Sequence, residues 1–381
     1  DQTFSGVMSG TGDLLKDTGA SSTLTLTGVN TFDGDTDVAS GTLVVSGAGV
    51  LGAGAYSGDV SLASGTALVY SSSADQTFSG LISGGGALTK DTDGSSTLTL
   101  TGNNTATGVA TVNAGTLAVG AGGTSGAITS DVTNNATLVF NRSDDDTYAG
   151  QISGTGALDK QGAGTLSLSD AQTYTGDTVV SAGSLQLING GKLGDGTYAG
   201  DISLAAGASL QYSANADQAL SGVISGAGAL TKDTTASTLT LTGDNTYTGV
   251  TTVDTGTLSV GDGGASGAII SDLVNSAAVV FNRSNDDTYT GVISGTGTMD
   301  KQGDGTLSLS GVQTYSGDTA VTAGVLQVVG AGQLGAGVYA GDITVDSGAS
   351  LQYSASVDQT FSGVISGGGA LTKDTDGSST L

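Results

Sequence analysis

The chain has 381 residues and a formal net charge of −26 at pH 7, with 67 Gly and no Pro, Cys, His or Trp. This acidity argues against a nucleic-acid partner, because binding a phosphate backbone requires clustered Lys and Arg. The lack of Cys and His excludes disulfides, thiolate metal sites and the Ser-His-Asp and Cys-His catalytic arrangements. Every acidic residue is Asp, and an alphabet of Asp, Gly, Ser, Thr and Asn favours strands and turns over helices.

Neither disorder nor a membrane span fits the composition. Hydrophobic residues make up 37% of the chain and fall in regular strand-like runs, whereas disordered segments lack such runs. No apolar stretch approaches the roughly 18–20 residues that a membrane-spanning helix requires. No secretory signal opens the sequence, and Asp1 begins in the middle of a repeat.

A tandem repeat of roughly 70 residues organises the whole chain. The segment from Asp75 to Leu98, DQTFSGLISGGGALTKDTDGSSTL, recurs from Asp358 to Leu381 with one change, from Leu81 to Val364. Every second repeat matches best. We therefore expect one continuous domain over 1–381, made of the repeats 1–74, 75–144, 145–216, 217–285, 286–357 and a partial 358–381.

Each repeat contains three short strand patterns with apolar residues two positions apart. Their leading residues are Leu24, Leu43, Leu68, Leu98, Leu117, Leu138, Leu166, Leu185, Leu210, Leu239, Leu258, Val279, Leu307, Leu326, Leu351 and Leu381. Successive leading positions lie roughly 19 to 30 residues apart, and steps of this length that return to an equivalent strand are typical of a β-solenoid. The sequence therefore predicts an all-β parallel β-helix of about 15 coils, each step being one coil.

The shortest step recurs unchanged and is expected to be the bare coil, and the longer steps to carry loops. It separates Leu24 from Leu43 and, in the next repeat, Leu98 from Leu117. Within the longer step that follows Leu43, the Gly-rich segments 47–49 and 52–54 are the predicted loops.

Glycines that precede strands are predicted to form corners. Gly41, Gly115 and Gly256 stand at such positions and suit a turn that needs a positive φ. The rival fold is a string of antiparallel sandwich domains, but those usually need about 90–100 residues and a large aromatic core.

The middle of the repeat resembles a known family. It reads STLTLTGVNTFDGDTDVASGTLVV from Ser22 to Val45 and STLTLTGDNTYTGVTTVDTGTLSV from Ser237 to Val260. Both are similar to the autotransporter-associated β-strand repeat, also called the passenger-associated transport repeat. The pattern returns at 165–187 and 306–328, and from 97 to 119 in a weaker form in which Ala106 replaces the aromatic residue.

This resemblance implies a right-handed parallel β-helix passenger exported to the surface of a Gram-negative bacterium, commonly as an adhesin or aggregation factor. It also implies a C-terminal translocator β-barrel outside this segment. The chain is then a window of a longer repetitive protein.

Aspartate carboxylates are the remaining candidates for metal binding or catalysis. Asp33, Asp35 and Asp37 have the spacing of calcium ligands, and the run 144–146 is three contiguous Asp. The first set lacks the rest of an EF-type loop, including its final Glu. We interpret both sets as solvated turns and predict no catalytic, cofactor-binding or metal-binding residues. Adventitious calcium binding and a glycosidase pair of carboxylates are the alternatives.

Basic and aromatic residues recur with the repeat, which favours structural roles. Lys192 alone has no counterpart. The recurring cations are Lys16, Lys90, Lys160, Lys232, Lys301 and Lys373, with Arg142 and Arg283 in matching Asn-Arg-Ser motifs. The aromatic columns are Phe4, Phe78, Tyr148, Tyr289 and Phe361; Phe32, Tyr174, Tyr247 and Tyr315; Tyr56, Tyr198 and Tyr339; and Tyr70, Phe140, Tyr212, Phe281 and Tyr353. We expect the lysines to pair with an Asp on the adjacent coil, and the aromatics to pack in the core or the loops.

Threonine triplets raise the possibility of ice binding. Thr23, Thr25 and Thr27 begin a series of T-x-T motifs that recurs only every third coil or more sparsely. At a rise of about 4.8 Å per coil, gaps of roughly 14 Å would break the lattice that ice binding needs.

The function that these features favour is non-enzymatic: a cell-surface adhesin or self-association stalk that binds identical chains or a host or matrix surface. It needs no cofactor, and this segment does not insert into a membrane. A filament or matrix subunit and a polysaccharide-acting enzyme on the same scaffold are the alternatives.

Overall fold

The structure is a computed structural model that describes residues 1–91, 96–374 and 379–381. Over these ranges it contains short β-strands and three single turns of 3-10 helix, η1 (Gly52–Gly54), η2 (Gly194–Gly196) and η3 (Gly335–Gly337). Every strand pairing among the described residues is parallel, so the antiparallel sandwich alternative is wrong. The chain divides into two compact units: Asp1–Leu185 with Leu193–Asp195, and Gln186–Lys192 with Gly196–Leu381.

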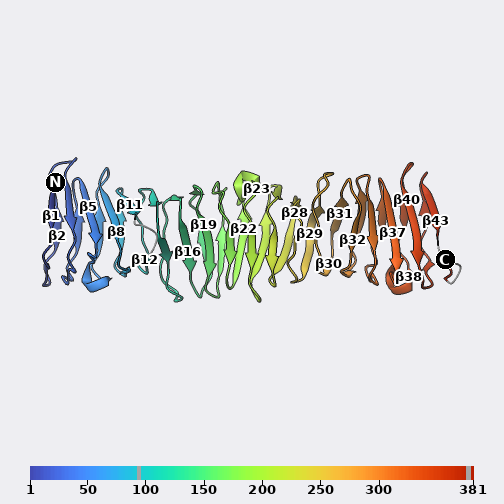
Figure 1. Cartoon of the computed structure of the whole chain (residues 1–381), viewed down its shortest axis with the longest axis horizontal. Helices are drawn as coiled ribbons and strands as arrows, with labels where there is room; N and C mark the ends of the chain where they lie inside the picture. Colours follow the sequence, from blue (N-terminus) through green and yellow to red (C-terminus); the bar gives the residue numbers. More distant parts are fainter. Residues whose placement is uncertain (92–95, 375–378) are drawn as a thin grey trace. The chain divides into compact units, whose positions relative to one another are not determined.

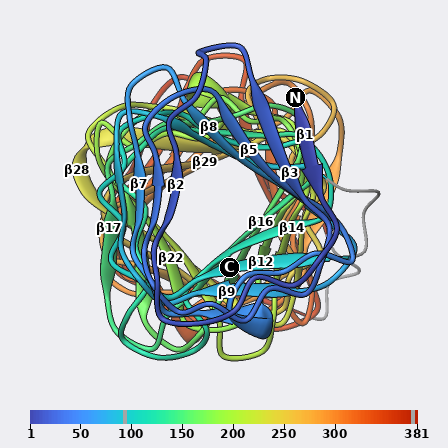
Figure 2. The same cartoon turned by 90° about the vertical axis from the view of Figure 1, so that its left-hand side faces the viewer.

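The first unit winds its strands into sheets that enclose one core (Figures 1 and 2). One sheet contains β1 (Gln2–Phe4), β3 (Thr23–Leu26), β5 (Thr42–Gly47), β8 (Ala67–Ser72), β11 (Ala87–Lys90), β13 (Ala110–Val112), β15 (Val132–Asn134) and β18 (Ile152–Ser153). A second contains β2 (Leu14–Lys16), β4 (Thr36–Val38), β7 (Val60–Leu62) and β10 (Ile82–Gly84). A third contains β6 (Ala55–Tyr56), β9 (Gln76–Phe78), β12 (Thr97–Leu100), β14 (Thr116–Val119), β16 (Thr137–Asn141), β19 (Ala157–Gln161) and β21 (Thr178–Val180). β17 (Asp146–Tyr148) pairs with β20 (Thr165–Leu168), and β22 (Ser184–Asn189) contributes residues to both units.

The second unit is built in the same way. One ladder contains β23 (Thr197–Tyr198), β26 (Gln218–Leu220), β28 (Ala229–Leu241), β29 (Thr251–Val260), β31 (Ala278–Asn282), β34 (Thr298–Gln302), β36 (Thr319–Val321), β39 (Ile343–Val345) and β42 (Ile365–Ser366). β28 and β29 also pair with β25 (Ser209–Ala214) and β30 (Leu273–Asn275), and β30 with β33 (Ile293–Ser294). The other ladders are β24 (Ile202–Leu204) with β27 (Ile224–Gly226); β32 (Asp287–Tyr289), β35 (Thr306–Leu309), β37 (Val325–Gly330), β40 (Ser350–Ala355) and β43 (Ala370–Lys373); and β38 (Val338–Tyr339) with β41 (Thr360–Phe361).

The register corrects the predicted spacing at one kind of step. Leu24, Leu43 and Leu68 are direct partners in one ladder, as expected. The next partner of Leu68, however, is Leu88 and not Leu98, which pairs with Gln76 in a different sheet. The long step from Leu68 to Leu98 is therefore one coil plus a transfer to the neighbouring sheet. For this reason the described parts of the chain make about 17 turns, slightly more than the expected number of coils.

The same transfer occurs in the second unit. Val279 pairs with Met299, whereas Leu307 belongs to another ladder and pairs with Leu326. In both units the leading strands of one repeat therefore pair with one another, and those of the following repeat pair in a different ladder. The parallel β-solenoid is confirmed, while its right hand and its continuity over 1–381 stay predictions.

Short strands alternate between inward apolar and outward polar side chains, and glycine forms the corners. Gly41, Gly115 and Gly256 have φ values of 74°, 73° and 79°, which confirms their predicted role. At Gly80 a Cβ atom would lie 2.2 Å from the carbonyl oxygen of Gly58, so only glycine permits the close approach of successive coils there. The predicted loop at 52–54 is confirmed as η1, which lies between the paired strands β5 and β8.

Candidate functional site

Five of the six repeat lysines lie inside the solenoid, and only Lys373 is exposed. Lys160 and Lys301 are each 2% exposed. The ammonium group of Lys160 donates to the carbonyl oxygens of Gln161 at 2.8 Å, Gly162 at 3.0 Å and Ala182 at 3.1 Å. Lys301 makes the same three contacts in the second unit, at 2.7, 2.8 and 3.2 Å. The expected pairing with Asp is therefore wrong for these two lysines, because main-chain oxygens from two successive coils hold each charge.

Burial affects the charge state of these lysines. Desolvation lowers the pKa of Lys160, and the carboxylates of Asp145 and Asp159 oppose that shift. Desolvation lowers the pKa of Lys301 in the same way, opposed by nearby aspartates. A buried ammonium needs several hydrogen bonds to offset its lost hydration. These lysines therefore connect coils and are not available to a ligand.

Aspartates on the outside perform a second repeated role. The Asp145 carboxylate accepts the main-chain N–H of Thr165 at 2.8 Å, and Asp286 accepts that of Thr306 at 2.8 Å. Hydrogen bonds from the Thr306 main chain and hydroxyl lower the pKa of Asp286. The same inter-coil bond is made by Asp1, Asp13, Asp35, Asp59, Asp75, Asp131, Asp201, Asp217, Asp272, Asp318, Asp342 and Asp358. A short side chain that reaches the neighbouring backbone with little loss of rotamer entropy explains the use of Asp and not Glu.

Each candidate carboxylate set contributes one aspartate to this scheme, Asp35 from the alternating set and Asp145 from the contiguous set. Asp35, from the alternating set, accepts the N–H of Asp59 at 2.8 Å. In the contiguous set of Asp144, Asp145 and Asp146, the first pairs with Arg142 at 2.8 Å. Among the residues that the structure describes, no group of three or more metal-ligating side chains is arranged to hold an ion.

Aromatic side chains fill the core. Fifteen of the 17 are buried, the exceptions being Phe4 and Phe361. Spatial neighbours come from different sequence columns: the ring of Tyr56 packs edge-on against Phe32 at 5.5 Å and against Phe78 at 5.9 Å. This confirms the expectation of core packing.

Outward threonines form interrupted columns. Thr25 pairs with Thr3 on one side and Val44 on the other, and Val44 pairs with Val69. The next threonine, Thr89, pairs with Val69, so it lies three coils from Thr25, as the expected gap requires. The column is therefore not a uniform hydroxyl lattice.

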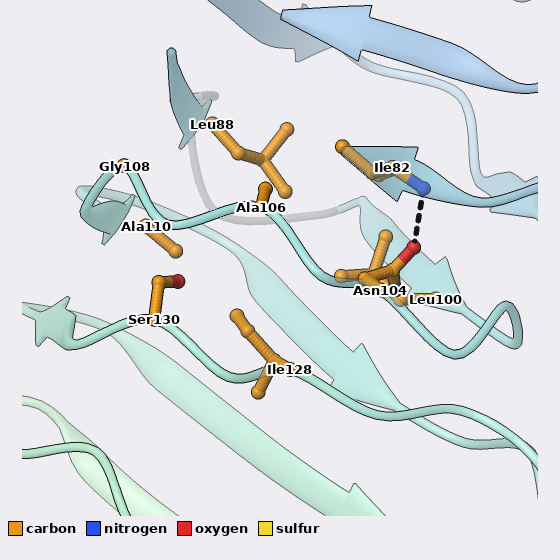
Figure 3. A pocket seen from close by; sticks show the side chains of 9 residues that line it. All are labelled: Ile82, Leu88, Leu100, Asn104, Ala106, Gly108, Ala110, Ile128 and Ser130. Carbon is orange, nitrogen blue, oxygen red and sulfur yellow. Dashed lines mark hydrogen bonds between the residues drawn. The ribbon is translucent and has the colours of Figure 1, made fainter. Parts of the chain in front are cut away.

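A small cavity in the core lies beside Ala106 (Figure 3). It has a volume of about 10 Å³ and is lined by apolar side chains, among them Leu88, Leu100 and Ile128. A volume of this size holds one water molecule at most. The cavity is a packing defect and not a ligand site.

A glycine-rich loop and an arginine form a more specific feature on the surface. Residues 120–126, GAGGTSG, follow β14, and the guanidinium of Arg142 donates to the carbonyl oxygen of Gly126 at 2.7 Å. Main-chain bonds from Gly122 to Asn141 at 2.8 Å and from Ser143 to Gly123 at 2.9 Å fix the loop against β16. The sequence predicts a structural role for the Asn-Arg-Ser motif, and the structure shows that its arginine anchors this loop.

Beside the loop, the outer face of the third sheet is hollowed. The hollow, here called the amide groove, has a volume of about 350 Å³. It is lined by Thr97, Thr99, Thr116, Ala118, Gly120, Ala121, Val139, Asn141 and Gln161. Ala118 and Val139 face outward yet are only 8% and 7% exposed, because taller side chains surround them. The groove therefore has a small apolar floor and walls of hydroxyl and amide groups.

The second unit repeats the loop anchor and the positions of the groove residues, although Ser259 and Val280 are more exposed than Ala118 and Val139. Arg283 donates to the carbonyl oxygen of Gly267 at 3.2 Å, as Arg142 does to Gly126. The amide of Gln161 donates to Asp159 at 2.6 Å, and its counterpart in the second unit makes the same bond at 2.7 Å. Sequence reasoning noted the matching arginine motifs but missed the groove. The positions of Thr99, Ala118, Val139, Asn141 and Gln161 are taken there by Thr240, Ser259, Val280, Asn282 and Gln302.

The fold and these contacts define a parallel β-solenoid whose recurring charged and aromatic side chains connect and fill its coils. Five segments match the family model Passenger-associated-transport-repeat: residues 18–45, 92–119, 158–187, 236–260 and 299–328. Each contains the two leading positions that the shortest step separates, such as Leu24 and Leu43 in the first segment. The chain thus carries passenger-associated transport repeats, and the resemblance read from its sequence is confirmed.

A curated relative supports this assignment. The chain is 34% identical over 222 residues to the Adhesin BmaC autotransporter of Brucella suis biovar 1, a match that covers 52% of this chain and 6% of that protein. The chain therefore corresponds to a small part of this relative's length. No solved structure matches the chain. Within the described residues, no helix has the length and apolar character needed to cross a membrane.

Proposed function

We propose that this chain is a non-enzymatic adhesive segment of an autotransporter passenger, displayed on the surface of a Gram-negative bacterium. The observation that carries the proposal is the fivefold passenger repeat, together with the identity to an adhesin autotransporter. Partners of the segment are identical chains or a host or matrix surface, and a translocator β-barrel lies elsewhere in the parent protein.

The placement of the side chains supports a binding role over a catalytic one. The cations with catalytic potential, such as Lys160 and Lys301, are held by carbonyl oxygens in the interior. The Asp145 and Asp286 carboxylates are committed to main-chain N–H groups. What the chain offers to solvent is a repeated surface of hydroxyl, amide and carboxylate groups, which suits repeated weak contacts whose strengths combine.

Beads coated with the purified chain test the proposal. We expect them to adhere to cultured host cells or matrix-coated wells more than albumin-coated beads do. Beads coated with a Leu117→Asp/Leu258→Asp chain, which should not form the coils, are the control. Equal adhesion of wild-type and albumin beads would contradict the proposal.

The enzyme alternative has its own assay. The chain is incubated with a panel of neutral and acidic polysaccharides, with and without calcium. We expect no oligosaccharide release, and reproducible release would establish catalysis instead. Sedimentation across a wide concentration range separates a filament subunit, which would form long assemblies, from an adhesive monomer or small oligomer.

A further inference from the structure

We propose that the amide groove and the matching surface of the second unit each bind an uncharged glycan, giving two related sites per chain. This inference rests on the proposed adhesive function and names the ligand class that its surface recognises. The two sites come from different repeats of the sequence, and each is complete within one unit.

The size and the lining of the amide groove suit a small ligand such as a sugar ring. A hollow of about 350 Å³ lies at the lower end of the range typical of small-molecule sites, roughly 300–1,000 Å³. Its floor of Ala118 and Val139 can pack against the C–H face of a sugar ring. Its walls supply the hydroxyls of Thr97, Thr99 and Thr116.

Amide groups without a hydrogen bond to the protein can recognise the hydroxyl groups of a sugar. The structure gives the carboxamides of Asn141 and Asn282 no hydrogen bond to any described residue. Each amide presents two donors and one acceptor oxygen, which is the combination that recognises vicinal hydroxyl groups. The neighbour of Asn141 on the next coil, Gln161, is by contrast occupied with Asp159.

Charge selects a neutral ligand. The described residues that line the amide groove include no Lys or Arg, and the chain carries a net charge of −26, so sialylated, sulfated or phosphorylated ligands are repelled. A cationic ligand would meet no carboxylate among the same lining residues. An uncharged polyhydroxylated ligand is neither repelled by the negative charge nor in need of a charged partner in the groove.

The sheet geometry argues against a peptide strand as the ligand. Strand addition needs an exposed sheet edge with unpaired main-chain groups. β14 and β16 are paired with strands on both sides, so their backbone groups are already bonded. Only side chains face the groove, and these favour a compact ligand.

Two double variants test the proposal in the full chain. Asn141→Ala/Asn282→Ala removes the free amides, and Val139→Arg/Val280→Arg fills both floors with charge. Val44→Arg/Val69→Arg is the matched control, because these two valines face outward on another sheet and the change in charge is the same. Far-UV circular dichroism checks that all three fold like the wild type.

Binding is measured by isothermal titration calorimetry against a panel of neutral oligosaccharides and the sialylated form of each. We expect two sites per wild-type chain for at least one neutral glycan and at least tenfold weaker binding of its sialylated form. We expect at least tenfold weaker binding by both groove variants and unchanged binding by the control. Each single Asn variant should leave one site.

Three outcomes would overturn the inference: no binding of any neutral glycan, equal binding of the charged form, or equal loss in the Val44→Arg/Val69→Arg control. The adhesive function is judged separately. If wild-type beads adhere but the chain binds no neutral glycan, the groove proposal fails and the adhesive function stands. If the chain binds a glycan but its beads do not adhere, the adhesive function fails instead.

Discussion

The coil around Tyr247 and the coil around Ala106 occupy the same place in two equivalent repeats, yet one is filled and the other is hollow. Tyr247 is fully buried, and its hydroxyl shares a hydrogen bond of 2.6 Å with Thr251, which in turn contacts Ser271 at 2.7 Å. At the corresponding positions the first unit has Ala106, Ala110 and Ser130, which line the cavity (Figure 3).

The backbone is nevertheless the same in both coils. The Asn104 side chain accepts the N–H of Ile82 at 2.8 Å beside the cavity, and Asn245 accepts that of Ile224 at 2.8 Å beside Tyr247. The winding therefore depends on the inter-coil hydrogen bonds, whereas the aromatic residue sets how densely each coil is packed. A solenoid can lose one core aromatic without losing its register.

The largest effect is expected from breaking the leucine ladder that each unit contains. Leu258 is fully buried between Leu239 and Val279, and Leu117 occupies the matching place in the first unit. Replacing either leucine with Asp buries an unpaired charge and also removes the leucine contacts, and together these should cost roughly 5 kcal/mol or more. Thermal melting followed by circular dichroism measures the loss.

The neighbouring Thr257→Asp, whose side chain points away from the core, is the control for Leu258→Asp. A melting temperature for Leu258→Asp no lower than that of this control would show that the ladder is assigned incorrectly.

Converting the filled coil into the hollow one should have the next largest effect. Tyr247→Ala removes a fully buried ring and the hydroxyl partner of Thr251. We expect a loss of about 3–5 kcal/mol in unfolding free energy, as for other buried aromatics changed to Ala. Chemical denaturation measures it, and Tyr247→Phe, which keeps the ring, should lose only about 1 kcal/mol. Equal losses in the two variants would mean that the ring contributes little.

The filled coil should also be the more sensitive to alkali. Burial raises the pKa of Tyr247 from 10.0 to about 12, since desolvation outweighs the opposing hydrogen bonds from Thr251 and Ser271. Between pH 10 and 12 the unfolded chain loses this proton and the folded chain keeps it. The stability that the neutral phenol contributes is therefore intact below pH 10 and is lost as the pH rises through 12. The difference between the two pKa values corresponds to about 3 kcal/mol.

Denaturation series at pH 9 to 12 measure this dependence, with Tyr247→Phe as the control. The variant should lose stability less steeply over that range than the wild type. Parallel pH profiles for the two chains would contradict the pKa assignment.

The sequence predicts the shorter coils of this architecture but not the longest steps, and one feature of the intervening strand explains most of the difference. Apolar residues two apart and corner glycines give the shorter coils correctly. The longest steps, such as that from Leu68 to Leu98, are predicted as single coils because the strand between these leucines lacks the apolar-x-apolar pattern. In β11, Leu88 pairs with Leu68, but the position facing Tyr70 is taken by Lys90, which is fully buried. From the sequence this lysine is expected to pair with an Asp on the adjacent coil, so its strand is not recognised as part of the core.

The amide groove is harder to predict, because its lining comes from several strands spread over residues 97–161. Asn141 and Gln161 share a column only through the pairing of β16 with β19. The sequence signal that was present, the recurrence of the Asn-Arg-Ser motif, marks the loop anchor and not the groove itself.

The smallest effect is expected from filling the hollow coil. Ala106→Tyr with Ala110→Thr places the Tyr247–Thr251 pair in a coil whose surrounding residues Leu100 and Ile128 match Leu241 and Ile269 of the filled coil. The cavity there has room for one water molecule at most, so the ring must displace its neighbours, and that cost offsets the new ring contacts. We expect the free energy of unfolding to change by less than about 1 kcal/mol. Ala106→Tyr alone should be the less stable of the two variants, because its hydroxyl would lack the threonine partner. A double variant destabilised by several kcal/mol in chemical denaturation would mean that the coil around Ala106 cannot adopt the packing of the coil around Tyr247.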